Sequence, residues 1–137
     1  MKISSSSALQ VAIRLPGDAP REREFLMEYI TEEEHALQWV ERYPQDKEAM
    51  LPYLREEKNI YRVMCLFPEE AHKVLGMIRS PEYAYYVAQS FPAYRREMRE
   101  IVKQSPEWLR KWVTTFPWDT AAIIALARAK DEKGGEN

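Results

Sequence analysis

The sequence predicts an all-α fold of tandem two-helix repeats of about 24 residues, forming a short right-handed-type helical solenoid or a compact helical array. Three observations predict it: a regular series of aromatic-proline pairs, helix-start signals before them, and apolar positions with a helical period. The pairs are spaced 24, 24 and 25 residues apart, at Tyr43-Pro44, Phe67-Pro68, Phe91-Pro92 and Phe116-Pro117. Such an interval is typical of repeat proteins, in which each unit packs on its neighbours. Pro20, 24 residues before Pro44, opens a fifth and degenerate unit.

Helix-start signals precede these pairs. Ser80-Pro81 and Ser105-Pro106 each place a capping hydroxyl before a proline at the first helical position. Thr31 and Glu34 have the spacing of a capping box. Each of these helices is expected to end at the next aromatic-proline pair, because proline disfavours the α conformation in the residue before it. The proline then begins the first helix of the next unit, so we predict very short turns.

Aligning the units on the proline gives apolar columns that follow one face of each helix. Helices this short are marginal alone, so the columns are expected to form a shared core. Before the proline the columns are Ala36, Ile60, Ala84 and Leu109; Trp39, Val63, Val87 and Trp112; and Val40, Met64, Ala88 and Val113. After the proline they are Leu26, Met50, Val74, Met98 and Ile123; Tyr29, Tyr53, Met77, Ile101 and Leu126; and Ile30, Leu54, Ile78, Val102 and Ala127.

Pro52 and Gly76 stand inside the predicted first helices of two units, eight residues after the proline. Both residue types disfavour a helix interior. We expect these helices to end early at the two positions, and a hinge is the alternative.

The ends of the chain differ from the repeats. We expect residues 1–19 to form an N-terminal arm with a degenerate capping helix that begins near Ser7, and residues 20–130 to form the helical-repeat domain. Residues 131–137, DEKGGEN, have no apolar side chain and are expected to be a disordered tail.

The 24-residue period, with a proline-led helix and a second helix that ends as in Val87-Ala88-Gln89-Ser90-Phe91-Pro92, resembles the short helical units of leucine-rich-repeat-variant proteins. The resemblance covers roughly residues 20–127 and concerns the repeat architecture, so it implies no activity. Those units usually carry Asn before the proline, where this chain has aromatic residues. The iron-sulfur region associated with one such protein has no counterpart, since Cys65 is the only cysteine.

The sequence gives little support for polyanion binding, for a metal site or for a catalytic site. Basic and acidic residues nearly cancel, at 20 and 22, which argues against a general binder of polyanions. Two Glu-x-x-His motifs, Glu32 to His35 and Glu69 to His72, recur in di-iron bundles, but here we interpret them as surface charge and packing. The acids two residues after the prolines, Glu22, Asp46, Glu70 and Asp119, fit the first turn of a helix, where the helix dipole favours negative charge. We therefore expect no catalytic site, no cofactor and no metal.

The charge pattern along the chain carries the functional prediction. Residues 21–58 have a net charge of −5 and residues 92–117 a net charge of +3, which predicts an electrical dipole. Aromatic residues outside the apolar columns gather in the later part, and Trp118 is one of them. Tyrosine and arginine are enriched at binding hot spots. We predict that one patch binds a protein partner, preferably an acidic one, through Tyr85, Tyr86, Tyr94, Arg95, Arg96 and Arg99.

The sequence thus predicts a non-catalytic protein-protein interaction module, an adaptor, inhibitor or effector. Packing between units is the alternative role of the tyrosines. Alternative functions are a nucleic-acid-associated repeat that uses the basic and aromatic patch in residues 85–111, or an enzyme with a pocket between repeats.

A cytoplasmic protein with no membrane span is expected, because the chain has one cysteine and no long apolar run. The oligomeric state stays open.

Overall fold

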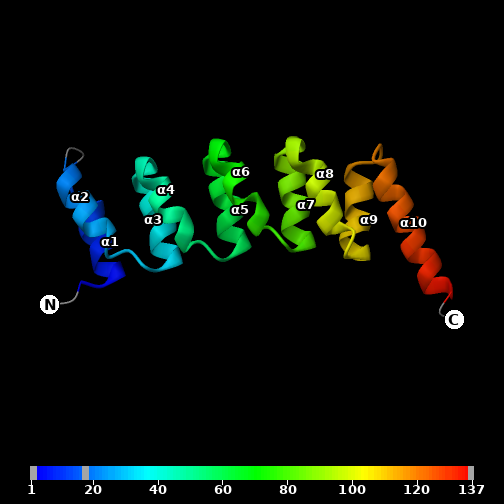
Figure 1. Ribbon diagram of the computed structural model, residues 1–137, viewed down its shortest axis with the longest axis horizontal. Helices are drawn as coiled ribbons and strands as arrows, with labels where there is room; N and C mark the ends of the chain where they lie inside the picture. Colours follow the sequence, from blue (N-terminus) through cyan, green and yellow to red (C-terminus); the bar gives the residue numbers. More distant parts are fainter. Residues whose placement is uncertain (1–2, 17–18, 136–137) are drawn as a thin grey trace. The chain divides into compact units, whose positions relative to one another are not determined.

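The computed structural model describes residues 3–16 and 19–135, and its regular secondary structure is helical (Figure 1). The described residues contain no strand, which confirms the all-α prediction. The α-helices are α1 Ser5–Ile13, α2 Pro20–Met27, α3 Glu33–Arg42, α4 Lys47–Met50, α5 Glu57–Leu66, α6 Ala71–Val74, α7 Pro81–Ser90, α8 Arg95–Val102, α9 Pro106–Thr115 and α10 Thr120–Gly135. Five 3-10 segments flank the shorter helices: η1 Pro44–Asp46, η2 Leu51–Tyr53, η3 Pro68–Glu70, η4 Leu75–Met77 and η5 Pro92–Tyr94. In the described part of the chain, no helix has the length and apolar character that a membrane crossing requires.

Contacts divide the chain into two compact units, residues 1–59 and 60–137, with the boundary inside α5. In the first unit, α1 packs against α2 and α3, and α3 packs against η1 and α4. In the second unit, α8 packs along α7, and α9 contacts α7, α8 and α10. The second unit holds all six residues of the predicted binding patch.

Each aromatic-proline pair lies at a helix boundary, as the sequence predicts. The residue before the proline leaves the α conformation, with φ between −121° and −132° at the four junctions. Its N–H still donates to the carbonyl four residues earlier, as from Tyr43 to Trp39 and from Phe91 to Val87. In three of the four pairs the proline starts a 3-10 turn at once, so one residue separates two helical segments.

Helix starts agree with the sequence at α7 and α9, where Ser80 and Ser105 accept hydrogen bonds from the N–H groups of Tyr83 and Trp108. The capping box of Thr31 and Glu34 was wrong. Helix α3 begins at Glu33 with Glu32, not Thr31, at its N-cap position and has no side-chain cap. The Thr31 N–H, which Glu34 would accept in a capping box, donates to the Ser5 hydroxyl at 3.2 Å. Helix α1 begins at Ser5, earlier than the expected Ser7, since Ser4 caps it.

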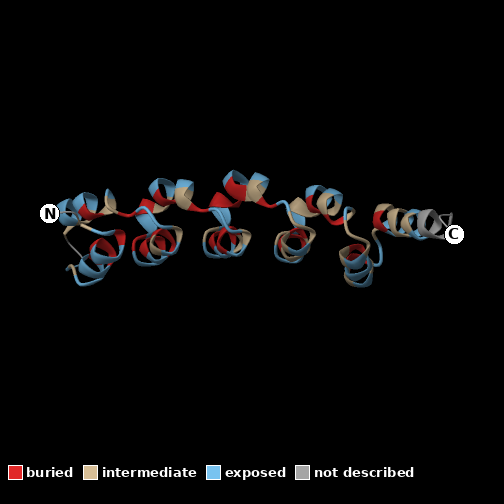
Figure 2. Ribbon diagram, turned by 90° about the horizontal axis from the view of Figure 1, so that it is seen from below, coloured by how far each residue is buried: buried red, intermediate tan, exposed pale blue. Residues whose placement is uncertain are grey.

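Outside α10, five of the six predicted core columns are buried, except for the half-buried Val113, and Figure 2 shows that the helices have distinct buried and exposed sides. The sixth column is wrong as core, because it is only half-buried throughout: Tyr29, Tyr53, Met77, Ile101 and Leu126. Trp39, Val63, Val87 and Trp112 are fully buried. Helix α10 departs from the pattern: Ile123 is 41% exposed and Ala127 is also exposed, whereas Ala122 is buried. The reason is local, because Pro117–Asp119 form a turn instead of a 3-10 segment and Asp119 accepts the Ala122 N–H, which changes the helix register.

Early termination at Pro52 and Gly76 is confirmed. Helix α4 ends at Met50 and α6 ends at Val74, and a 3-10 turn follows each of them. At the ends of the chain, residues 1–2 and 17–18 of the predicted arm and residues 136–137 of the predicted tail lie outside the described residues. The backbone of residues 131–135, for which disorder is expected, continues α10.

Candidate functional site

Each compact unit contains a tryptophan whose indole N–H donates to an aspartate seven residues later. In the first unit, Trp39 Nε1 lies 2.9 Å from Asp46 Oδ2, and Arg23 Nε lies 2.9 Å from the same oxygen. In the second unit, Trp112 Nε1 lies 2.9 Å from Asp119 Oδ2. These bonds connect a buried aromatic ring to a carboxylate at the start of the next helical segment.

Asp119 also forms an ion pair with Arg99, whose Nη1 lies 3.2 Å from Oδ1. Burial opposes ionisation of this carboxyl. The hydrogen bonds from Trp112 and from the Ala122 N–H, together with the Arg99 charge, outweigh burial and hold the pKa of Asp119 below its ordinary value. Asp119 is therefore a fixed negative charge that holds the Arg99 side chain in place.

The sequence contained a signal for these bonds. Trp39 and Trp112 are followed seven residues later by aspartate, whereas Val63 and Val87 at the same column are followed by Glu70 and Tyr94. A column that has aspartate only where its partner column has tryptophan indicates a direct contact. The helix dipole explains why an acid is favoured in this column but not why it is aspartate in these two units.

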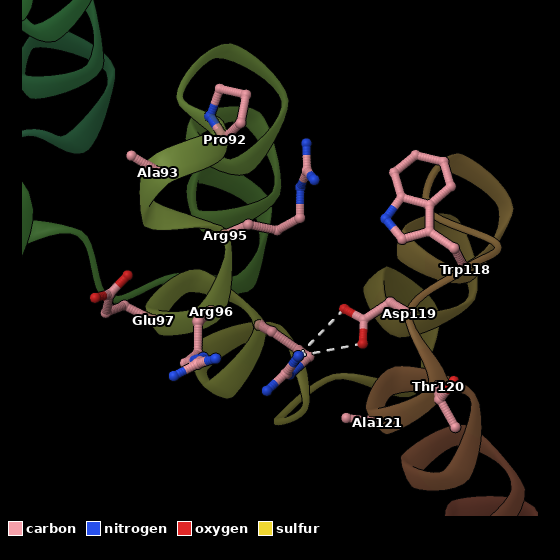
Figure 3. A pocket seen from close by; sticks show the side chains of 10 residues that line it. Pro92, Ala93, Arg95, Arg96, Glu97, Trp118, Asp119, Thr120 and Ala121 are labelled. Atoms are coloured by element: carbon pink, nitrogen blue, oxygen red, sulfur yellow. Dashed lines mark hydrogen bonds and ion pairs between the residues drawn. The ribbon is translucent and has the colours of Figure 1, made fainter.

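A pocket of about 590 Å³ opens beside Asp119 in the second unit (Figure 3). One wall comes from the start of the Pro92–Val102 segment and the other from Trp118 to Ala121. We call it the arginine pocket and define it by the residues that line it: Pro92, Ala93, Arg95, Arg96, Glu97, Arg99, Trp118, Asp119, Thr120 and Ala121. Figure 3 shows Arg95 extending from α8 toward Trp118, while Glu97 points away from both.

Aromatic rings hold Arg95 at the pocket. Its guanidinium carbon lies 4.5 Å from the ring centroid of Phe116 and 5.7 Å from that of Trp118. Phe116 is buried and contacts Trp118 edge-on at 5.7 Å, but Trp118 itself is 64% exposed. Stacking on rings orients a guanidinium without using its N–H donors.

Several arginine nitrogens in this pocket have no acceptor among the described residues. The Nε atoms of Arg95 and Arg99 are buried and make no hydrogen bond. Neither Arg95 nor Arg96 forms an ion pair within the described part of the chain. Buried donors in proteins nearly always have a partner, which can be ordered water, and the Arg99 Nε lies 3.8 Å from Glu100 Oε1.

The predicted tyrosines lie elsewhere. Tyr85 and Tyr86 contact Trp108, at ring-centroid distances of 5.6 and 5.9 Å, and the Tyr85 hydroxyl bonds to Thr115 at 2.6 Å. Burial and the nearby Glu82 raise the pKa of Tyr86. Tyr94 packs against Phe91, with 6.1 Å between the ring centroids. None of the three lines the arginine pocket, which Arg95, Arg96 and Arg99 do. Tyr85 and Tyr86 instead join α7 to α9, and Tyr94 makes a local contact three residues along the chain.

Ser5, His35 and Glu32 come together at the start of α3 and superficially resemble a nucleophile relay. His35 Nδ1 lies 2.8 Å from Ser5 Oγ and 2.9 Å from Glu32 Oε2. A relay needs the two partners on different ring nitrogens, and here the same nitrogen faces both. Ser5 is also buried, so these contacts serve to join α1 to α3.

Among the residues that the structure describes, no three His, Cys, Asp or Glu side chains form a group able to hold a metal ion. The two Glu-x-x-His motifs remain separate surface features: Glu32 pairs with its own helix neighbour His35, and Glu69 and His72 are exposed.

Comparison with protein-family models, with curated proteins and with solved structures finds no match for this chain. The resemblance to leucine-rich-repeat-variant units is therefore not accompanied by a family match.

Proposed function

We propose that this protein is a non-catalytic protein-protein interaction module built on tandem two-helix repeats, and that its arginine pocket binds an acidic segment of a partner protein. The recurring junctions and buried columns support the repeat organisation. The observation that carries the binding role is the pair of arginines, Arg95 and Arg96, that have no carboxylate partner in the described chain and line one pocket beside the exposed Trp118.

The chemistry of the pocket favours an anionic ligand with an apolar part. An arginine that stacking already holds in place has little side-chain freedom left to lose when a ligand binds. Its planar donors suit a carboxylate or a phosphate. An exposed tryptophan at the rim offers a large apolar surface, which is the kind of residue that dominates binding energy at interfaces. A protein segment with an acidic side chain next to an apolar one satisfies both features.

A nucleic acid is the second candidate, and the surroundings of the pocket argue against it. Glu97 and Asp119 line the same pocket, and Glu100 lies 3.8 Å from Arg99. A polyanion needs a basic track that continues along several phosphates. Carboxylates this close to the arginines fit a single anionic group better than an extended backbone.

The test is a double charge reversal, Arg95→Glu with Arg96→Glu, in the full chain. The partner is first identified by pull-down from the native host and mass spectrometry, and its affinity is then measured with purified proteins. The reversal should weaken binding by at least about a hundredfold, because it replaces attraction by repulsion at the contact.

The matched control reverses two neighbouring bases of the same unit outside the pocket, Arg110→Glu with Lys111→Glu. This control makes the same change in net charge and should change affinity by less than about threefold, as expected for charges far from the contact. If both double variants weaken binding equally, or if the pocket variant keeps its helicity and its affinity, the arginine pocket is not the interface.

A further inference from the structure

The first compact unit has a second, mostly apolar pocket of about 370 Å³, which we call the apolar pocket. It is lined by residues of α1, of the connection after it and of α2: Val11, Leu15, Arg21, Glu22, Phe25 and Leu26. Val11 is 51% exposed and Phe25 is 54% exposed, so much of its apolar lining faces solvent. Because a cavity of about 150 Å³ holds a benzene ring, this pocket has room for an indole.

Carboxylates flank the apolar pocket. Glu22 and Glu28 lie three residues before and after Phe25, and residues three apart are neighbours on the surface of a helix. Glu22, Glu24 and Glu28 are exposed, and within the described part of the chain none of them forms an ion pair. The exposed charges of α2 and its C-cap residue are three acids and one base, a net charge of −2.

The arginine pocket has the complementary features. Its charged lining residues are three arginines and two acids, a net charge of +1. Arg95 extends toward Trp118, whereas Arg96 points to a different side (Figure 3), so the two guanidiniums suit two separate carboxylates. Trp118 and Phe25 are the two most exposed large apolar side chains of the described residues. One surface thus projects an indole beside cations, and the other has an apolar pocket beside acids.

We propose that the arginine pocket of one copy of this chain binds the apolar pocket of a second copy. The Trp118 indole enters the apolar pocket, and Arg95 and Arg96 meet the carboxylates that flank Phe25. This proposal rests on the proposed function and names its partner, because the acidic segment is α2 of another copy.

A second copy satisfies both surfaces at once. An unrelated acidic protein would cover the arginine pocket and leave Phe25 exposed, whereas self-association buries Trp118 and Phe25 together. The net charges of −5 for residues 21–58 and +3 for residues 92–117 act in the same direction, since they draw the first unit of one copy to the second unit of another. Because the two surfaces differ, the contact is made either twice in a reciprocal pair or repeatedly in a longer assembly.

The experiment is sedimentation equilibrium of the full chain at low salt. The average mass should rise above that of one chain as the concentration increases from about 1 µM to about 1 mM. The dissociation constant should increase by about tenfold when the salt is raised to about 0.5 M, because screening weakens the attraction between the two charged surfaces.

Two variants each remove the aromatic side chain of one surface. Trp118→Ala and Phe25→Ala should each weaken self-association by about tenfold or more, because aromatic residues carry much of the binding energy at interfaces. An equimolar mixture of the two should associate with an affinity within about twofold of the unchanged chain. The reason is that Phe25→Ala keeps an intact Trp118 and Trp118→Ala keeps an intact apolar pocket. A fluorescent label on one variant identifies the mixed assembly.

Leu66→Ala is the matched control. Leu66 is 45% exposed and lies in α5 outside both pockets, so its truncation should change self-association by less than about twofold. Circular dichroism verifies that each variant keeps its helicity.

A chain that stays a single copy at the highest concentration would overturn the proposal. A mixture that associates no better than either variant alone would also overturn it, because that result excludes a contact between the two different surfaces. The same holds if Leu66→Ala weakens association as much as Trp118→Ala does. Failure of the proposed function appears in a different measurement, the unchanged affinity of the double reversal for the partner found by pull-down.

Discussion

Asp119 links the hydrophobic core to the arginine pocket at the scale of single residues. One of its carboxylate oxygens accepts the indole N–H of the fully buried Trp112, and the other lies 3.2 Å from Arg99 at the pocket wall. A change at this carboxylate should therefore affect both the stability of the second unit and the position of Arg99.

The first prediction concerns Asp119→Asn. The folded-state pKa of Asp119 lies below its ordinary value, so its ionised form contributes stability that is present above that value and is lost as the pH falls through the folded pKa. At about pH 7 the variant should lose about 1–3 kcal/mol, the usual effect of weakening a hydrogen bond to a charged group. Urea melts across the acid range should show the two proteins converging at low pH, and a difference that stays constant would contradict this account.

The second prediction compares two tryptophans six residues apart. Trp112 is fully buried, so Trp112→Ala should lower the free energy of unfolding by about 3–5 kcal/mol through the cavity it leaves. Trp118 is 64% exposed, and Trp118→Ala should change it by less than about 0.5 kcal/mol. Denaturant melts of both variants test the assignment, and similar losses for the two would mean that the burial pattern is wrong.

Part of the arginine pocket and its surroundings could be predicted from the sequence. The burial of Trp39 and Trp112 was predictable because it follows from the helical period, which is a local property. The arginines were predictable from charge density. The pocket was not, since it forms from α8 and the Trp118–Ala121 segment, and only the fold brings Arg99 beside Asp119. The tyrosines were chosen for their residue type, and the contacts of Tyr85 and Tyr86 with Trp108 depend on helix packing that the sequence does not specify.

At the scale of helices, the aromatic-proline pairs were reliable because proline restricts its own backbone and that of the residue before it. Capping was less predictable. A capping side chain competes with every other acceptor near the same N–H. The Thr31 N–H, for example, donates to the Ser5 hydroxyl. An acceptor from a different helix also appears at the start of α5, where the Glu33 carboxylate accepts the N–H groups of Arg55 and Glu56.

The third prediction tests the caps. Ser105→Ala removes the hydroxyl that accepts the Trp108 N–H and should cost about 1 kcal/mol, a typical value for the loss of such a cap. Thr31→Ala is the matched control, because the Thr31 side chain does not cap α3, and it should cost clearly less. Chemical denaturation of the two variants measures both losses. If Thr31→Ala lowered the free energy of unfolding as much as Ser105→Ala or more, the Thr31 side chain would cap α3 after all.

The fourth prediction concerns Gly76. It lies in the 3-10 segment η4 with a negative φ, and no atom lies within 4 Å of where a Cβ would stand. Gly76→Ala should therefore stabilise the protein by about 0.4–1 kcal/mol by restricting the unfolded chain. A thermal melt provides the test, and destabilisation would indicate that the segment needs the freedom of glycine, as the hinge alternative requires.

At the scale of the whole molecule, charge is distributed unevenly between the two compact units. Residues 21–58 of the first have a net charge of −5, and residues 92–117 of the second have a net charge of +3. An acidic partner is thus attracted to one unit and repelled by the other, so the charge distribution should influence which part of the protein it meets first.

The fifth prediction follows from this attraction. The association rate with an acidic partner should fall by about tenfold between low salt and about 0.5 M salt, while the dissociation rate changes little, because screening acts mainly on the approach. Stopped-flow or surface-binding kinetics measure both rates. A salt effect of many powers of ten on the affinity would instead indicate displaced counterions from a nucleic acid.

The single residue that separates helical segments at Tyr43, Phe67 and Phe91 limits how such a chain can change in evolution. With no loop to absorb a change of length, deleting one residue near a junction turns the following helix by about 100° and moves its apolar face toward water. Adding or losing a complete period leaves every junction intact. Related genes are therefore expected to differ by duplication or loss of whole units of about 24 residues, and small insertions should be confined to connections such as residues 103–105 between α8 and α9.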